Sequence, residues 1–294
     1  MRRVLLALIA VALLTPARAE AACGVPPAKA EYETPEVQVH LRGARLVACH
    51  RASGLQRRVG VRVNDGMGTD ESSYVNGVLG GRWVWTSSFA SFGESADVQE
   101  DSLVDLRTGK SVRAIVEDED TIDADAIALP GVLIVATEAG VQARWIDGRV
   151  EQLSAESSRA LAAVGSRVYW TEAGGVANSA VLTLPAADPP RPKPLARTVG
   201  RCKPRPGARL LVRDGALVVS RAGGVTWACR GSKTRRVSSS ADVTVLSERW
   251  VIYPGGVLFV ANGRHTALNG NEAATDGVYG YALDGAGTPV VTTL

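Results

Sequence analysis

The run EDEDTIDAD, residues 117–125, places six acidic side chains within nine residues. Carboxylates at this density can bind calcium, or can act in pairs as acid and base in glycoside hydrolysis. The run predicts weak calcium ligands at Asp118, Asp120, Asp123 and Asp125. The spacing does not match an EF-hand loop, because no Gly stands at the sixth position and no Glu at the twelfth. A solvated acidic loop between two strands is the alternative interpretation.

Basic residues gather in other parts of the chain. Seven Lys or Arg residues and no acid lie between positions 191 and 209, and the similar stretches ACHRASGLQRRV (48–59) and ACRGSKTRRV (228–237) are also basic. Guanidinium groups suit recognition of phosphate or carboxylate. The predicted anion-binding positions are Arg191, Lys193, Arg197, Arg201, Lys203, Arg205, Arg235 and Arg236. The alternative is a set of solvated turns whose charge is balanced by the acidic stretch from Glu94 to Asp125.

The sequence contains no motif that pairs a nucleophilic side chain with a base. No GxSxG motif occurs. Of the three histidines, His40 and His50 flank a predicted strand pair, and His265 lies in a predicted hairpin turn. A hydroxyl or thiol nucleophile needs a base within hydrogen-bond reach. We therefore predict no catalytic residue and no cofactor, and the sequence favours a protein that is not an enzyme.

The first 22 residues have the pattern of a secretory signal peptide. Two arginines precede an apolar run from Val4 to Leu14, and Pro16 and small residues follow it. Cleavage after Ala19 would lower the 33 basic residues to 30, equal to the 30 acidic residues. The mature chain then has no net charge to attract nucleic acid, and no later run is long enough to span a membrane. We predict a secreted, periplasmic or cell-envelope protein.

Four cysteines follow the predicted signal peptide: Cys23, Cys49, Cys202 and Cys229. An even number of cysteines in an exported chain predicts disulfide bonds. Three pairings are possible, and separations of 26 and 27 residues favour Cys23 with Cys49 and Cys202 with Cys229. Zinc is not expected, because no close CxxC spacing occurs.

Short β-prone segments recur along the whole chain. Examples are GRWVWTS at 81, GVLIVAT at 131, SRVYWTE at 166 and ERWVIYP at 248, and Gly-containing turns follow many of them. Strand, tight turn and strand is the pattern of a β-hairpin. One short helix is a candidate at 155–164 (AESSRALAAV). Repeats of about 40 residues with several strands each predict an all-β propeller of about seven blades, with six to eight possible.

One segment resembles known propellers more closely. SLVDLRTGKSVRAI, residues 102–115, is similar to the strand, Asp-x-x-Thr-Gly-Lys turn and strand that many secreted bacterial β-propellers have between the outer strands of a blade. Weaker matches are RWIDGRVEQL (144–153), VANGRHTAL (260–268) and YALDGAGTPVV (281–291). The resemblance implies that ACHRASGLQRRV and ACRGSKTRRV are one repeated hairpin in the first and fifth blades. Cys49 and Cys229 would then lie in non-adjacent blades and would not bond to each other. The alternative alignment of ARLVACH (44–50) with GALVVSR (215–221) shifts the cysteine register by one strand.

The segment 184–207 holds seven of the fourteen prolines and cannot form an inner strand. We predict a signal peptide at 1–22 and one propeller-like domain at 23–294, in which 185–207 is a Pro-rich basic loop between blades. The alternative is a linker between two all-β domains.

These observations favour an exported, monomeric, non-catalytic scaffold that binds a protein or an anionic glycan of the cell envelope. The alternative is a carboxylate-dependent glycan hydrolase or lyase that uses the acidic run at 117–125. Fold class alone does not decide between them.

Overall fold

The computed structural model describes residues 23–24, 30–64, 69–92, 95–118, 125–172, 174–187, 193–194, 201–241, 243–246, 249–268, 273–275, 279–283 and 289–293. The regular elements in these ranges are all β-strands. The predicted signal peptide lies outside the described residues. Within them, no helix has the length and apolar character needed to cross a membrane.

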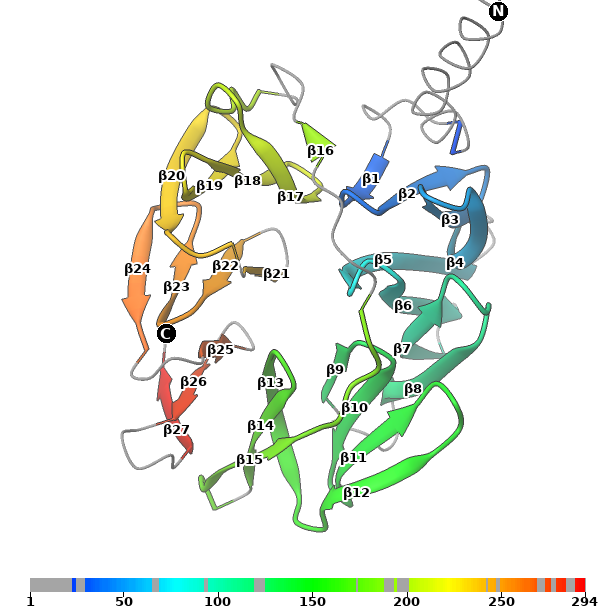
Figure 1. Cartoon of the computed structure of the whole chain (residues 1–294). Helices are drawn as coiled ribbons and strands as arrows, with labels where there is room; N and C mark the ends of the chain where they lie inside the picture. Colours follow the sequence, from blue (N-terminus) through cyan, green and yellow to red (C-terminus); the bar gives the residue numbers. More distant parts are fainter. Residues whose placement is uncertain are drawn as a thin grey trace, which may run out of the picture.

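The described strands form five hydrogen-bonded sheets, of 13, 4, 3, 4 and 3 strands. The 13-stranded sheet joins three four-stranded antiparallel units and one short strand, and we call these three units and the other four sheets blades 1 to 7 in chain order (Figure 1). Blade 1 contains β1 (Ala30–Glu33), β2 (Val37–Arg42), β3 (Arg45–His50) and β4 (Leu55–Asn64). Blade 2 contains β5 (Thr69–Leu79), β6 (Trp83–Phe92), β7 (Ser95–Asp105) and β8 (Ser111–Asp118). Blade 3 contains β9 (Asp125–Leu129), β10 (Val132–Thr137), β11 (Gly140–Trp145) and β12 (Val150–Ser154), and blade 4 contains β13 (Ser158–Val164), β14 (Arg167–Glu172) and β15 (Ala177–Val181).

The second part of the chain adds three blades and one short strand. Blade 5 contains β17 (Arg209–Asp214), β18 (Leu217–Ala222), β19 (Val225–Arg230) and β20 (Lys233–Ser238), and β16 (Lys193–Pro194) pairs with β17. Blade 6 contains β21 (Thr244–Leu246), β22 (Trp250–Tyr253), β23 (Gly256–Phe259) and β24 (Arg264–Ala267). Blade 7 contains β25 (Ala273–Thr275), β26 (Tyr279–Leu283) and β27 (Pro289–Thr293). The prediction of an all-β, propeller-like fold is confirmed.

The blades do not follow one another around the ring in chain order. Blades 1 to 4 run in one direction, and blade 5 then lies beside blade 1, because β1 pairs antiparallel with β17 (Figure 1). Blades 6 and 7 run back in the opposite direction until β25 and β27 contact β13 and β15 of blade 4. The prediction that the first and fifth blades are non-adjacent is therefore wrong. The chain reverses its direction around the ring after blade 4. No sequence motif that we identified predicts this reversal.

The repeated hairpin occurs in blades 1 and 5 with the same register. Ala48 faces Arg57 between β3 and β4, and Ala228 faces Arg235 between β19 and β20, with a β-bulge at the same place in both pairs. Arg57 donates from Nε to the carbonyl of Leu106, and Arg235 donates from a guanidinium nitrogen to the carbonyl of Asn262, both at 3.3 Å. One arginine of each copy therefore joins its blade to the next blade along the chain.

The disulfides follow the same repeat. Cys23 bonds Cys49, and Cys202 bonds Cys229, as the sequence separations favoured. Each bond ties the segment before a blade to the third strand of that blade. All four cysteines are buried. Disulfides and a propeller-like ring are thus properties of this chain.

The helix expected at 155–164 is not present. Ser158–Val164 forms β13, which pairs with β14 along its length. Leu161 is buried together with Val132, Trp145 and Trp170 in a hydrophobic core that blades 3 and 4 form between them. Because pairing and burial across two blades outweigh local helix propensity, the segment is a strand.

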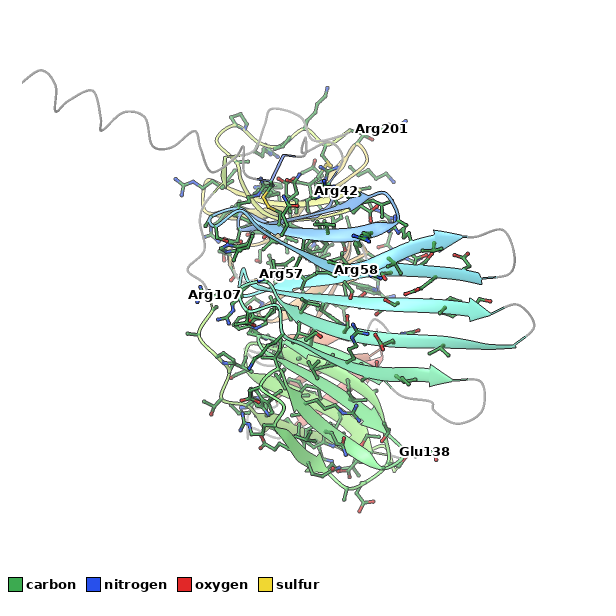
Figure 2. The ribbon with its side chains drawn as sticks, turned by 90° about the vertical axis from the view of Figure 1, so that its right-hand side faces the viewer. Arg42, Arg57, Arg58, Arg107, Glu138 and Arg201 are labelled. Atoms are coloured by element: carbon green, nitrogen blue, oxygen red, sulfur yellow. A yellow bond between two sulfur atoms is a disulfide. The ribbon has the colours of Figure 1, made fainter. Side chains whose placement is uncertain are left out.

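Strands of blade 2 are unusually long. β5 and β7 have 11 residues each, and Figure 2 shows the paired strands β4 to β8 extending past the other blades at one face of the ring. On one face of these strands, Tyr74, Ser87 and Asp101 lie in a row, because they are direct partners across β5, β6 and β7.

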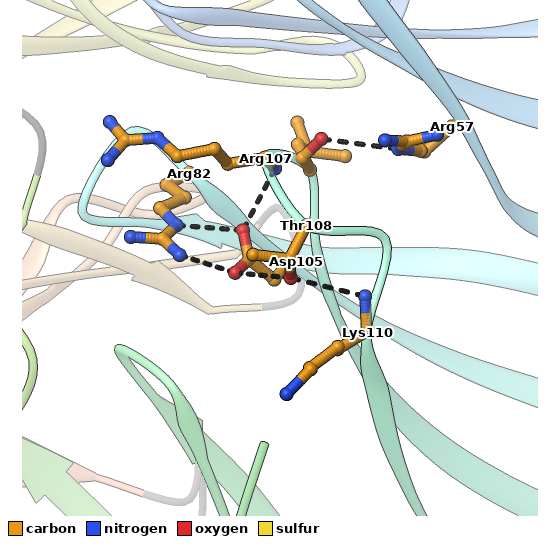
Figure 3. Close-up of polar contacts among 7 residues, drawn as sticks. Arg57, Arg82, Asp105, Arg107, Thr108 and Lys110 are labelled. Carbon is orange, nitrogen blue, oxygen red and sulfur yellow. Dashed lines mark hydrogen bonds and ion pairs between the residues drawn. The ribbon is translucent and has the colours of Figure 1, made fainter. Parts of the chain in front are cut away.

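The Asp-x-x-Thr-Gly-Lys turn connects β7 and β8, the outer strands of blade 2, as its resemblance to propeller turns implied (Figure 3). The Asp105 carboxylate accepts hydrogen bonds from the Arg107 amide at 2.9 Å and the Thr108 hydroxyl at 2.8 Å. Arg82 donates to both carboxylate oxygens, at 2.7 and 2.5 Å. Gly109 has φ +76°, a conformation that side chains other than Gly rarely adopt. The motif is a self-contained structural turn.

The described start of the Pro-rich segment, residues 184–187, lies against turns of blades 3 and 2. Pro185 lies against Gly131 at the turn between β9 and β10, and Ala187 lies against Gly80 at the turn between β5 and β6. Neither glycine can accept a Cβ here without displacing the segment, since the added atom would lie 2.7 and 2.9 Å from these neighbours. These contacts bring the chain from blade 4 toward blades 1 and 5.

Candidate functional site

A candidate site is a cavity on the inner side of the ring, with a volume of about 740 Å³. This size lies within the usual range for small-ligand sites. Blades 1, 2, 3, 5 and 6 all contribute to its lining. The lining residues are Glu31, Tyr32, Arg62, Tyr74, Val75, Asn76, Trp85, Ser87, Gln99, Asp101, Asp125, Ala126, Asp214, Gly215, Arg230 and Arg249.

Asp101 is a buried carboxylate in the wall of this cavity, with only 2% of its surface exposed. Trp85 donates from Nε1 to one carboxylate oxygen at 2.7 Å, and Ser87 donates to the other at 2.6 Å. Asn76 donates in turn to the Ser87 hydroxyl at 2.6 Å. The long strands of blade 2 therefore hold a connected row of polar groups at the cavity.

The pKa of Asp101 lies above its ordinary value. Burial raises it, the hydrogen bonds from Ser87 and Trp85 offset only part of that effect, and the charge of Glu100 raises it further. Tyr32, in the same cavity, is also shifted: burial and the negative charge of Asp214 raise the pKa of its phenol. Tyr32 thus remains a neutral hydrogen-bonding group at physiological pH.

Tyr74 presents the most exposed aromatic ring of the cavity, with 55% of its surface accessible. The Arg62 guanidinium lies 5.5 Å from the centre of this ring and pairs with Glu31 at 2.7 Å. A cation over the ring face restrains both side chains. The cavity therefore offers an accessible aromatic face next to polar groups that are already positioned.

The predicted calcium ligands are only partly described. Asp120 and Asp123 lie outside the described residues, and Asp118 ends β8. Asp125 lines the cavity, where one of its carboxylate oxygens accepts the Leu161 amide at 2.8 Å. In the described ranges no cluster of three His, Cys, Asp or Glu residues is placed to hold a metal ion. Calcium binding by this run stays a prediction.

The predicted anion-binding residues are dispersed. Arg191 and Arg197 lie outside the described residues, and Lys193 lies in β16. Arg201 and Lys203 are exposed, and they flank the buried Cys202. Arg205, also exposed, lies 4.4 Å above the Trp227 ring. On β20, Arg235 contacts the turn of blade 6, whereas Arg236 is exposed. A role in anion binding stays a prediction for these residues.

Sequence reasoning missed the main residues of the cavity. No sequence motif contains Asp101, Tyr74 or Asn76. In the sequence they differ from other polar residues only in lying inside long β-prone segments. An acid in the middle of a strand is unusual enough to be noticed, since strands are poor in Asp. The hydrogen-bond donors to Asp101, Trp85 and Ser87, come from another strand, β6, and sequence spacing does not identify them.

No protein-family model matches the chain, and no curated protein matches it. Solved structures with similarity include the AfRom2 CNH domain, at 8% identity and a TM-score of 0.25, covering 90% of this chain and 79% of that one. The WD40 domain of SCAP from fission yeast has 9% identity and a TM-score of 0.22, with coverages of 79% and 73%. The tricorn protease has 12% identity and a TM-score of 0.21, and the match covers 87% of this chain and 34% of that one. At these TM-scores the similarities carry no argument about function.

Proposed function

We propose that the protein is an exported, non-catalytic binding scaffold that takes a hydroxyl-rich ligand, a glycan, in the cavity inside the ring. The observation that carries this proposal is the row of Asp101, Ser87 and Asn76 beside the exposed ring of Tyr74. A sugar ring has an apolar C–H face that fits an aromatic side chain, and hydroxyl groups that fit carboxylate, amide and hydroxyl partners.

The hydrogen bonds within the cavity favour binding over catalysis. Both carboxylate oxygens of Asp101 already accept bonds from Trp85 and Ser87, and Asp125 accepts the Leu161 amide. A general acid or nucleophile must instead direct an oxygen at the substrate. The two disulfides support a location outside the cytoplasm, where such bonds persist.

Replacement of Tyr74 by Ala should weaken glycan binding at least about tenfold, which corresponds to about 1.4 kcal/mol, because the stacking face is removed. The measurement is titration calorimetry with soluble oligosaccharides that the unmodified protein binds. Tyr74→Phe keeps the ring and should retain most of the affinity. Val150→Ala, at an exposed position away from the cavity, is the matched control. Equal affinity for Tyr74→Ala and the unmodified protein would remove the cavity as the glycan site.

Glycan hydrolysis is the second candidate function, because Asp101 has a raised pKa and shares the cavity with Asp125. Its test is product release from the same oligosaccharides. Cleavage that disappears in Asp101→Asn would establish the enzyme and overturn the non-catalytic proposal. Binding without cleavage supports the scaffold.

A further inference from the structure

Another hollow lies along β2, β3 and β4 of blade 1, shares no lining residue with the cavity, and has a volume of about 630 Å³. We call it the arginine groove. Its lining is Arg42, Gly43, Ala44, Arg45, Val47, Gln56, Arg57 and Arg58. Four of these eight residues carry a positive charge and none is acidic. Figure 2 shows Arg42, Arg57 and Arg58 on the same outer side of the ring.

Strand register explains how the arginines come together. Arg42 and Arg45 are direct partners at the turn between β2 and β3, and Arg58 faces Val47 between β3 and β4. Side chains of directly paired residues point to the same face of a sheet. Arg42, Arg45 and Arg58 therefore share one face of blade 1, and all three are exposed.

Among the residues that the structure describes, no carboxylate pairs with the arginines of the groove. Arg42, Arg45, Arg57 and Arg58 form no ion pair with the described carboxylates, whereas Arg51 and Arg62 of the same blade pair with Glu33 and Glu31. The charge of Arg42 also contributes, after burial, to the lowered pKa of His40. Like charges held this close repel one another, and a bound anion would relieve that repulsion.

Blade 5 shows that the hairpin does not require this arrangement. The register places Ala222 and Val225 where blade 1 has Arg42 and Arg45, while Arg235 and Arg236 match Arg57 and Arg58. Of the four groove arginines, only Arg57 and Arg58 have an arginine at the matching position of blade 5. Arg42 and Arg45 are therefore additions specific to blade 1, and the fold does not explain them.

We propose that the arginine groove binds a ligand that carries two or more closely spaced phosphate groups. Guanidinium groups match phosphate oxygens in a planar, bidentate geometry. Each phosphate supplies up to two negative charges, so two groups balance the four arginines. The contact between Arg57 and the Leu106 carbonyl holds one arginine in place, and the other three remain available to the ligand. This site is independent of the proposed glycan cavity.

The test is calorimetric titration of the protein with tripolyphosphate, and in parallel with vesicles that contain phosphatidic acid. The unmodified protein should bind tripolyphosphate, and more weakly as the salt concentration rises. Arg45→Glu combined with Arg58→Glu should lower the affinity at least about tenfold, because attraction is replaced by repulsion. Vesicle binding that tripolyphosphate displaces would indicate a lipid headgroup as the source of phosphate, and its absence would indicate a soluble ligand.

Lys233→Glu combined with Arg264→Glu is the matched control, because it makes the same change of net charge at exposed positions of blades 5 and 6, outside the groove. It should leave tripolyphosphate affinity unchanged. Circular dichroism of each variant checks that the fold is intact. The proposal is overturned if the unmodified protein does not bind tripolyphosphate, if the Arg45→Glu, Arg58→Glu variant binds it equally well, or if the control variant loses as much affinity as that variant.

Discussion

Replacement of Asp105 by Ala is expected to lower the free energy of unfolding by about 3 to 5 kcal/mol, the usual cost of removing one partner of a buried ion pair. Asp105 is almost fully buried and accepts hydrogen bonds from Arg82, Thr108 and the Arg107 amide. Alanine would leave the Arg82 guanidinium, itself 18% exposed, without its carboxylate. Urea denaturation followed by tryptophan fluorescence measures the change.

Asp147→Ala is the matched control for this prediction. Asp147 stands at the corresponding hairpin turn of blade 3, is exposed, and accepts the Arg149 amide at 3.0 Å. Its replacement should cost about 1 kcal/mol or less. If the two variants lost the same small amount of stability, the Arg82–Asp105 pair would not be holding the turn of blade 2.

The same carboxylate makes stability depend on pH. Burial alone would raise the pKa of Asp105, but hydrogen bonds from Arg82, Thr108 and Arg107 and the charge of Arg82 outweigh it and hold the pKa at about 2. A lowered carboxyl pKa stabilises the fold above the unfolded-state pKa, and this contribution is lost as pH falls through the folded-state value. Between about pH 4 and about pH 2, Asp105→Asn should therefore lose less stability than the unmodified protein.

Removal of the disulfide in blade 5, by Cys202→Ala together with Cys229→Ala, is expected to lower the free energy of unfolding by about 3 to 4 kcal/mol. The bond closes a loop with a sequence separation of 27 residues, and the loop-closure model gives a value of this size. Both cysteines pack with Leu210 and Val218 in a small buried cluster. The measurement is a denaturation curve of each protein without reductant.

Reduction provides the control for this variant. Dithiothreitol should destabilise the unmodified protein by more than the variant, because the unmodified protein has two disulfides to lose and the variant retains only Cys23–Cys49. Coincident denaturation curves for the variant and the oxidised unmodified protein would show that this disulfide does not stabilise the fold.

Local features of the fold were predictable from the sequence. The Asp-Leu-Arg-Thr-Gly-Lys turn at 105–110 and the Asn-Gly turn at 262–263 connect the outer strands of blades 2 and 6, as expected from residues that favour tight turns. The cysteine pairing followed from separations of 26 and 27 residues. Each of these features involves groups that are near one another along the chain.

Features that depend on distant contacts were not predictable. The segment at 158–164 has local helix-forming residues, yet it pairs with β14 and buries Leu161 between blades 3 and 4. Asp101 carries no motif, and its role in the cavity depends on Trp85, Ser87 and neighbouring blades.

The sequence by itself determined most strands and hairpins, and it favoured the disulfide pairing and the repeat of the basic hairpin, because side-chain alternation, turn residues and short loops act locally. Only the tertiary structure decided that blade 5 lies beside blade 1, through the pairing of β1 with β17. The same long-range packing gives Arg57 and Arg235 a contact with the next blade, whereas Arg42 and Arg45 have no ion-pair partner among the described carboxylates. Their environments differ because residues far away in the sequence determine which groups surround each arginine.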